Sequence, residues 1–337
     1  MQALSVRRDV TWSIFTTVPE WFFSESGIRN YLYYLCRTDV GVVQDGPFEL
    51  DIERTEQDVA AFTENLEKQS SSIAEVLKRN AIDLTISDIS SLGVLAGKKF
   101  GLPTVIVENF LWDFIYSGLN SESNQLKGYG KVLTSIARRA DLHLRTNPFC
   151  TFYRDSIEVA PISRMFRTSR DEIRTQLGLA KEEKAILVSL GGVPGSYDLT
   201  NVFESNRTIK FIYHGADEKL PANVIRLEKH DRFYHPDLVN AVDGIVAKLG
   251  YSTLAEAINH RTVGCYVANR NNPEGEPLSK YVLSNGYGCV IDNEKFVNQE
   301  WVDIPTKLIE MKQFRAIPEN GADQAADLIL SFHVKGN

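Results

Sequence analysis

Several motifs that would define a binding site are missing from the sequence. Its 337 residues contain no Asp-x-Asp motif, no Gly-x-x-x-x-Gly-Lys-Ser/Thr loop and no Cys-x-x-Cys pair. The first absence excludes a common site for a metal-bound diphosphate, and the second excludes a P-loop phosphate site. The third excludes the usual zinc and dithiol sites. No run of 18 uncharged apolar residues occurs either, so we predict no transmembrane segment.

Cysteine is also scarce. The four cysteines lie far apart in apolar segments, at Cys36, Cys150, Cys265 and Cys289. Isolated cysteines of this kind are typical of buried free thiols in a reducing compartment, so we predict a cytoplasmic location.

The charge and size of the chain narrow the class of protein further. The formal net charge is −7, from 37 basic and 44 acidic side chains, which argues against a dedicated nucleic-acid-binding protein. With 43% hydrophobic residues the chain can bury a large core. Its length favours two domains.

Strands and helices alternate in the first half of the sequence. Strands are predicted for 83–88 and 103–107, on either side of a helix at 91–100. This order is typical of parallel strands with crossover helices, and therefore of a doubly wound α/β fold. Ligands of such sheets bind beyond the carboxyl ends of the strands, where Asp88 and Asp113 are predicted to lie.

The stretch 243–256 is predicted to form a strand, a glycine turn and the start of a helix. Gly250 permits the tight turn, and Ser252 or Thr253 can cap the helix while its first N–H groups face outward and attract phosphate. One alternative remains open. Thr253 and Glu256 have the spacing of a capping box, which stabilises a helix without binding a ligand.

This stretch and the polar loop 269–278 together resemble the donor-binding half of nucleotide-sugar glycosyltransferases of the GT-B architecture. That group includes the bacterial N-acetylglucosaminyltransferase of peptidoglycan synthesis. The loop after a predicted strand at 185–190 resembles the first glycine loop of the same domain. The resemblance implies that glycine turns and the helix start hold the diphosphate, that the acid on the helix contacts the ribose, and that the later loop contacts the sugar. The residues so implied are Gly191, Gly192, Gly250, Ser252, Thr253, Glu256 and Glu276.

The run 87–116 resembles the glycosyltransferase-like region of plant L-arabinose kinases. The resemblance does not extend to kinase activity, because the kinase domain of those proteins is a separate region. It implies two Rossmann-like domains in a GT-B fold. The first is an acceptor-side domain at 1–162, completed by a C-terminal helix at about 321–337, and the second is a donor-binding domain at 163–320.

The resemblance implies a glycosyltransferase of the hexosyltransferase type, with a nucleotide sugar as donor and an unknown acceptor hydroxyl. UDP is the default nucleotide of the family. The absence of an Asp-x-Asp motif favours a metal-independent reaction without a cofactor, in which helix N-termini and glycine loops hold the phosphates. A catalytically impaired nucleotide-binding protein and a nucleotide-sugar 2-epimerase are the alternatives.

An inverting transfer needs a general base from the first domain. Asp88 and Asp113 are the candidates. Alternatively, Asp88 caps the helix that follows it and Asp113 is a structural partner. His143, on a predicted strand, is expected to be a core histidine. His230 and His235, in the loop before 243–256, are either donor contacts or solvated surface residues.

The start of the sequence carries one further expectation. Relatives usually begin with a strand and a loop resembling Gly-His-Gly-x-Gly-His, ahead of the strand that matches 10–17 here. We therefore expect an amino-terminally shortened sequence whose first domain lacks its first strand and glycine-rich loop, with weak or no transfer activity.

Overall fold

The computed structural model shows a chain that folds as two compact units. Unit 1 comprises Met1–Val43, Asp51–Ile162 and Asn320–Asn337, and unit 2 comprises Gln44–Leu50 and Ser163–Glu319. The residues that the structure describes are 1–119, 124–191, 197–214, 220–227, 233–311, 314 and 319–336.

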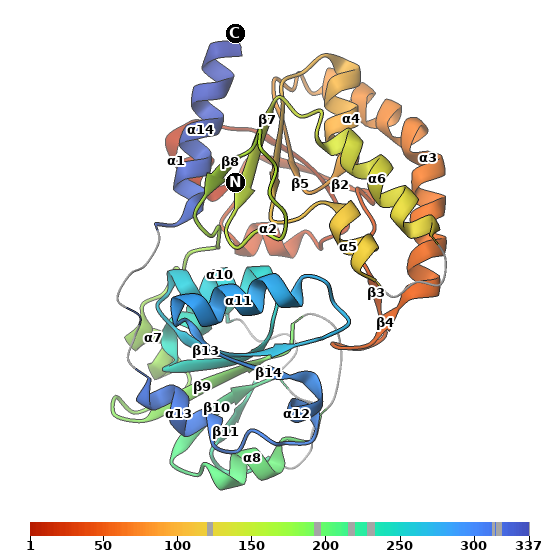
Figure 1. The fold of residues 1–337 in the computed structure, drawn as a ribbon. Coiled ribbons are helices and arrows are strands. Elements are labelled where there is room, and N and C mark those ends of the chain that lie inside the picture. Colours follow the sequence, from red (N-terminus) through yellow and green to blue (C-terminus); the bar gives the residue numbers. More distant parts are fainter. Residues whose placement is uncertain are drawn as a thin grey trace. The chain divides into compact units, whose positions relative to one another are not determined.

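Unit 1 contains a four-stranded sheet and a separate pair of strands, all parallel (Figure 1). The pair consists of β1 (Trp12–Thr16) and β2 (Tyr31–Leu35). Parallel pairing is what the alternation of strands and helices predicts. The sheet has the order β5, β6, β7, β8, formed by Thr85–Asp88, Thr104–Glu108, Leu142–Thr146 and Ile157–Val159.

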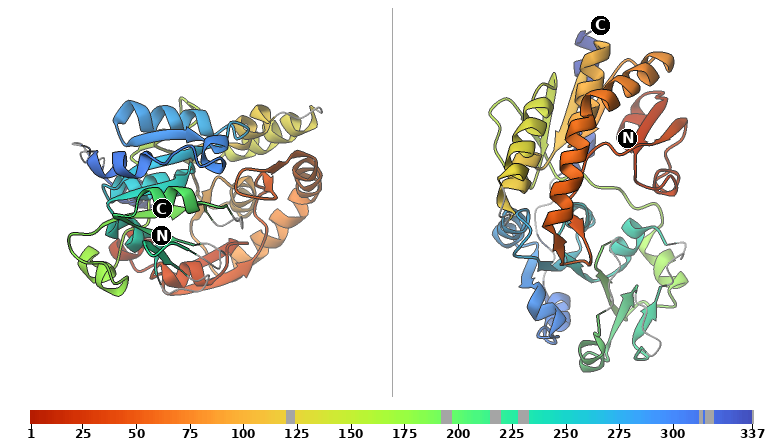
Figure 2. Two further views of the ribbon diagram at one scale, coloured as in Figure 1. Left: turned by 90° about the horizontal axis from the view of Figure 1, so that it is seen from below. Right: turned by 90° about the vertical axis from the view of Figure 1, so that its right-hand side faces the viewer.

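Helices cover both faces of the four-stranded sheet. On one face, Val105 packs against α14 (Gly321–Gly336). On the other face, Ile106 packs against α4 (Ser91–Phe100) and α6 (Gln125–Ala137). The long helix α3 lies against α4 (Figure 2). The bounds of α3 are Ile52–Arg79, and the remaining helices of unit 1 are α1 (Gln2–Arg7), α2 (Trp21–Glu25) and α5 (Trp112–Gly118).

Capping residues set the ends of α3 and α4. The carboxylate of Asp51 accepts a backbone N–H of the first turn of α3 at 2.8 Å, which fixes the start of this helix. The hydroxyl of Ser90 caps α4 in the same way. Gly101 ends α4 with φ 77°, a left-handed conformation that glycine adopts without strain.

Unit 2 is built around a six-stranded parallel sheet (Figure 1). Its central strands β9, β12 and β13 are buried on both faces, which explains why their sequences are rich in Val, Ile and Ala rather than alternating with polar residues. The sheet has the order β11, β10, β9, β12, β13, β14, formed by Val224–Arg226, Ile209–Tyr213, Lys184–Ser189, Gly244–Lys248, Val263–Ala268 and Gly288–Asp292.

Two hydrophobic cores lie on opposite faces of this sheet. Leu187 and Ile245 pack with α7, α9, α10 and α11 on one face, and Ile186 and Val246 pack with α8, α12 and α13 on the other. Unit 2 is thus a three-layer α/β structure of the kind that the sequence predicts. The helices are α7 (Arg170–Gln176), α8 (Thr200–Ser205), α9 (His235–Ala241), α10 (Tyr251–Asn259), α11 (Gly275–Asn285), α12 (Asn293–Val297) and α13 (Ile304–Glu310).

A segment from early in the sequence completes unit 2. Residues 44–50, which we call the finger, belong to this unit. Phe48 near the tip is only 5% exposed, and its ring lies 6.0 Å from that of Phe296. The sequence analysis did not identify this segment as part of the second half of the protein. The finger is flanked by two short paired strands, β3 (Val43–Gln44) and β4 (Leu50–Asp51).

Candidate functional site

The turn between β12 and α10 lies at the carboxyl edge of the unit 2 sheet. Gly250 is the N-cap of α10, its backbone is extended (φ −145°, ψ 152°), and no side chain caps the helix. Ser252 is exposed and Thr253 is half-buried. The first turn of α10 therefore presents N–H groups that no side chain caps, at the end of the helix dipole that favours an anion.

This geometry rules out the capping box. Ser252 and Thr253 lie inside the helix rather than at its N-cap, so the prediction that one of them caps it is wrong. The physical reason is that Gly250 already makes the turn into the helix, while the carboxylate of Glu256 is bound elsewhere. The capping-box interpretation, in which this turn binds no ligand, therefore loses its main support.

Glu256 is the centre of a buried polar network. Its side chain is 3% exposed, Oε1 accepts from Nε of Arg164 at 2.8 Å, and Oε2 lies 2.7 Å from Nδ1 of His235. The other ring nitrogen of His235 lies 3.1 Å from Oγ of Ser189, at the end of β9. Burial disfavours the charged carboxylate, but the hydrogen bond with His235 and the charge of Arg164 outweigh it, so the pKa of Glu256 is lowered.

The network links the end of β9 to the start of α9 and the middle of α10. His235 is therefore a bonded, half-buried residue rather than a solvated one. The ribose contact of Glu256 stays a prediction, and its carboxylate has two protein partners in this structure.

Lys248 is a candidate residue that the sequence analysis missed. It ends β12, two residues before Gly250, and its Nζ donates to Oε1 of Gln44 in the finger at 2.7 Å. Burial lowers the pKa of Lys248, while the carboxylates of Glu274 and Glu49 oppose that shift. A lone lysine at the end of a buried apolar strand is the sequence signal that could have identified it, because such a charge needs a partner.

The other donor-site residues implied by the resemblance lie in two loops. Gly191 follows β9 with φ 83°, which favours glycine, whereas Gly192 and His230 lie outside the described residues. Glu276 is exposed in the first turn of α11. The loop before it is fixed by Asn269, whose backbone and side-chain carbonyls accept N–H groups from within the loop. The contacts of these residues with a donor stay predictions.

In unit 1, Asp88 ends β5 and its side chain is exposed. The alternative that it caps α4 is wrong, because Ser90 takes that position. Ser90 also donates its hydroxyl hydrogen to the carbonyl of Thr38 at 2.7 Å, which holds the neighbouring Asp39 close to β5. Desolvation and, secondly, repulsion from Asp88 raise the pKa of Asp39 to about 6.

Asp39→Asn should therefore change the pH dependence of stability. The raised pKa of Asp39 in the folded state means that its stabilising contribution is complete below the unfolded value of about 3.9 and is lost as the pH rises through about 6. The neutral variant should gain roughly 1–2 kcal/mol relative to the wild type between pH 4 and pH 8, after allowance for solvent screening. Urea denaturation across this range measures the difference. Asp9→Asn, at an exposed carboxylate, is the control; a pH-independent difference for Asp39→Asn would contradict the expectation.

Asp113, the second candidate base, accepts several hydrogen bonds through one carboxylate oxygen. Its Oδ1 accepts from the Thr134 hydroxyl at 2.8 Å, the Phe114 N–H at 3.0 Å and the Tyr153 hydroxyl at 3.3 Å. These contacts fix the first turn of α5 against α6. They are the contacts of a structural residue, and its catalytic role stays a prediction.

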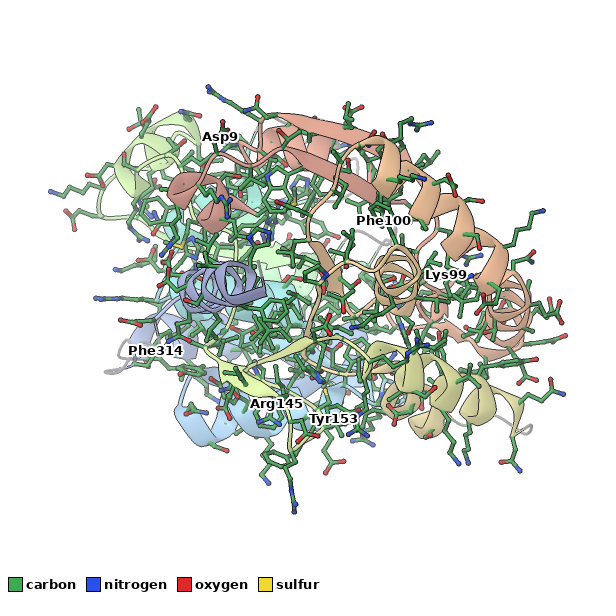
Figure 3. The ribbon with its side chains drawn as sticks, turned by 90° about the horizontal axis from the view of Figure 1, so that it is seen from above. Asp9, Lys99, Phe100, Arg145, Tyr153 and Phe314 are labelled. Carbon is green, nitrogen blue, oxygen red and sulfur yellow. The ribbon has the colours of Figure 1, made fainter. Side chains whose placement is uncertain are left out.

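His143 is a core residue with a bonded ring, as the sequence analysis expects. Its Nε2 lies 2.9 Å from Oε1 of Glu108, and both side chains are almost fully buried. Burial raises the pKa of Glu108, although the hydrogen bond with His143 opposes the shift. Arg145 lies on the same strand as His143 and donates to the carbonyl of Tyr153 at 3.3 Å (Figure 3). Protein groups satisfy this polar cluster only in part, because Oε2 of Glu108 and Nε of Arg145 are buried without a hydrogen-bond partner among the described residues.

Two features are absent from the described residues. No three His, Cys, Asp or Glu side chains there lie close enough together to hold a metal ion. None of the helices in the same part of the chain is both long and apolar enough to cross a membrane.

The sequence matches no family model. It is similar to the L-arabinokinase of Arabidopsis thaliana, with 27% identity over 258 residues, which cover 73% of this chain and 24% of that protein. The chain thus spans about a quarter of the length of this curated relative. The predicted likeness to plant L-arabinose kinases is confirmed.

The fold matches solved structures over almost the whole chain. The calicheamicin glycosyltransferase CalG4 matches with a TM-score of 0.60 and 15% identity, covering 99% of this chain and 93% of CalG4. Arabidopsis thaliana UGT89C1 complexed with UDP matches with a TM-score of 0.61 and 10% identity, covering 99% of this chain and 94% of that one. At such identities the likeness shows the fold alone. It confirms the predicted architecture: this chain has the GT-B fold of glycosyltransferases.

Proposed function

We propose that unit 2 binds a UDP-sugar and that the chain transfers the hexosyl group to an acceptor hydroxyl without a metal. The observation that carries the proposal is the start of α10, which has no side-chain cap and lies two residues after the half-buried cation Lys248. The bound UDP of the UGT89C1 structure, which has the same fold, supports the choice of nucleotide.

The chemistry follows from where charge develops. When the bond between the sugar and the diphosphate breaks, negative charge grows on the leaving phosphate. The N–H groups of the first turn of α10, the hydroxyls of Ser252 and Thr253, and the ammonium of Lys248 would stabilise that charge. The fixed turn at Gly250 holds these donors in place, so they need no reorganisation during the reaction.

We place the general base at Asp88, supported by Asp39. Both carboxyl groups lie where β5 ends, and the pKa of Asp39, raised to about 6, puts its proton exchange near neutral pH. A base with a pKa close to the working pH is the most effective at taking a proton from a hydroxyl. Asp113 is the weaker choice because its Oδ1 already accepts three hydrogen bonds.

A panel of nucleoside diphosphates and nucleotide sugars, measured by thermal shift, tests the binding part of the proposal. A ligand that binds the folded state at 100 times its Kd stabilises it by about 2.7 kcal/mol, which is a measurable rise in Tm. We expect UDP and UDP-sugars to raise Tm and uridine to raise it less. No rise with any nucleoside diphosphate would overturn the proposal.

A second function is favoured by the buried network around Glu256. Because this carboxylate already has two protein partners, unit 2 could bind the nucleotide in a way that does not support transfer. Release of UDP from a UDP-sugar, with and without candidate acceptors, separates the two functions. Nucleotide binding without release of UDP would identify a catalytically impaired nucleotide-binding protein, and epimerised donor would identify a 2-epimerase.

Thr253→Val should weaken UDP binding by about three- to tenfold, because it removes a hydroxyl that faces the proposed phosphate site. Stability should change little, since Thr253 does not cap α10. Calorimetric titration with UDP and thermal denaturation measure the two effects. Thr175→Val, on α7, is the matched control. A variant that binds UDP as tightly as the wild type would contradict the assignment of Thr253 to the phosphate site.

A further inference from the structure

The finger is fixed onto the strand ends of unit 2 by two kinds of contact. The ring of Phe48 packs between Tyr197 and Phe296, at 5.8 and 6.0 Å between ring centroids. The buried side-chain amide of Asn269, just after β13, donates to the carbonyl of Phe48 at 2.7 Å. The tip of the finger is therefore held at the carboxyl edge of the sheet, beside the proposed donor site.

Glu49 has a defined position on the finger. Its Oε2 accepts from the N–H of Phe48 at 3.3 Å and lies over Gly46. A Cβ at position 46 would come within 2.1 Å of Oε2, so a larger residue there would displace the carboxylate from this position. The local sequence thus holds an exposed acidic group beside a buried tip.

The carboxylates around Lys248 outnumber its single positive charge. The hydrogen bond of 2.7 Å between Lys248 and Gln44 holds the ammonium against the finger that carries Glu49, and the carboxylates of Glu274 and Glu49 oppose the lowering of the Lys248 pKa. Glu276 lies two positions further along the chain, exposed on α11. If Lys248 and the start of α10 neutralise the diphosphate of a nucleotide sugar, the carboxylates of Glu49, Glu274 and Glu276 are left to contact the sugar. Carboxylates accept hydrogen bonds from hydroxyl groups and repel a further carboxylate.

We propose that the finger forms the sugar end of the donor site and that Glu49 selects donors with an uncharged sugar over donors with a uronic acid. This inference rests on the proposed function and adds to it the class of sugar. Hydroxyl groups of a neutral hexose donate to Glu49 and Glu274, whereas the carboxylate of a uronic acid would lie against the same two charges. Selection of this kind works by excluding the wrong ligand rather than by tighter binding of the right one.

Calorimetric titration of the full chain with UDP, UDP-glucose and UDP-glucuronate tests the inference. The wild type should bind UDP-glucose more tightly than UDP-glucuronate, with a Kd lower by a factor of about ten or more. Glu49→Gln should reduce this ratio to about threefold or less. Glu49→Asp, which keeps the charge, should preserve the discrimination. Glu53→Gln, an exposed acid in the first turn of α3, is the control and should behave as the wild type.

The outcomes separate the two proposals. If UDP does not bind, the proposed function fails and the inference fails with it. If UDP binds but the wild type accepts both sugars equally, or Glu49→Gln leaves the ratio unchanged, the inference is overturned and the nucleotide site remains. Because Glu49 is exposed, its variants should fold, and an unchanged Tm for each verifies this.

Discussion

Replacing Glu256 by glutamine is expected to lower the free energy of unfolding by about 2–3 kcal/mol. The side chain is 3% exposed and holds Arg164 at 2.8 Å and His235 at 2.7 Å. Glutamine has nearly the same shape, so the loss comes from leaving Arg164 without its counter-charge in a partly buried position, rather than from a cavity. Urea denaturation at pH 7 measures the change.

The pH dependence distinguishes this cause from simple misfit. The pKa of Glu256 is lowered in the folded state, so its contribution is fully present above the unfolded value of about 4.3 and is lost as the pH falls through the folded value. The difference between wild type and variant should therefore be complete at pH 7 and shrink below about pH 4. Glu182→Gln, an exposed acid of the same unit, should show no such difference. A deficit that is the same at all pH values would point to packing instead of charge.

Lys248→Met should weaken UDP binding by about 10- to 100-fold, the range expected when a charged hydrogen-bond donor to phosphate is lost. Methionine keeps the apolar length of the side chain and removes the ammonium that donates to Gln44. Binding of uridine, which has no phosphate, should be almost unaffected. Calorimetric titrations with UDP and uridine provide the comparison.

The matched control for Lys248→Met is Lys181→Met. Lys181 is exposed in the turn that leads into β9, at the opposite edge of the same sheet. Its removal changes the net charge by the same amount without touching the proposed site. Equal losses of UDP affinity in both variants would mean that the overall charge, and not the position of Lys248, governs binding.

Local patterns of sequence were enough to predict the parallel α/β layers. The strand predicted within the stretch 243–256 is observed at Gly244–Lys248, and the predicted helix 91–100 is observed with its Gly101 end. Both depend on contacts between near neighbours, namely buried apolar runs, a cap and a left-handed glycine. The capping of α10 was mispredicted because Gly250, Ser252 and Thr253 all have the propensity to begin a helix, and the choice among them is made by the tertiary partners of Glu256.

The candidate site was only partly visible in the sequence for the same reason. The turn at Gly250 could be recognised from its residues. The role of Lys248, in contrast, depends on its hydrogen bond with Gln44, about 200 positions earlier in the chain. Asp39 has a raised pKa because the fold desolvates it and, secondly, because Asp88, which lies on another element, repels its charge. No period or local motif marks such pairs, because the fold alone brings them together.

The finger also bears on how the chain is made on the ribosome. Phe48 is synthesised 221 positions before Asn269, its hydrogen-bonding partner. At a translation rate of about 5–20 residues per second, the aromatic ring of Phe48 would stay unburied for roughly 10–45 s, until Asn269 has been synthesised. During that interval unit 2 does not exist, and the ring is open to chaperones or to other nascent chains. A fragment of residues 163–319 would lack Phe48, so the aromatic core around Phe296 would lose one of its packing partners. The autonomy of the second half of the chain is thus only apparent, since its folding depends on seven residues translated long before it.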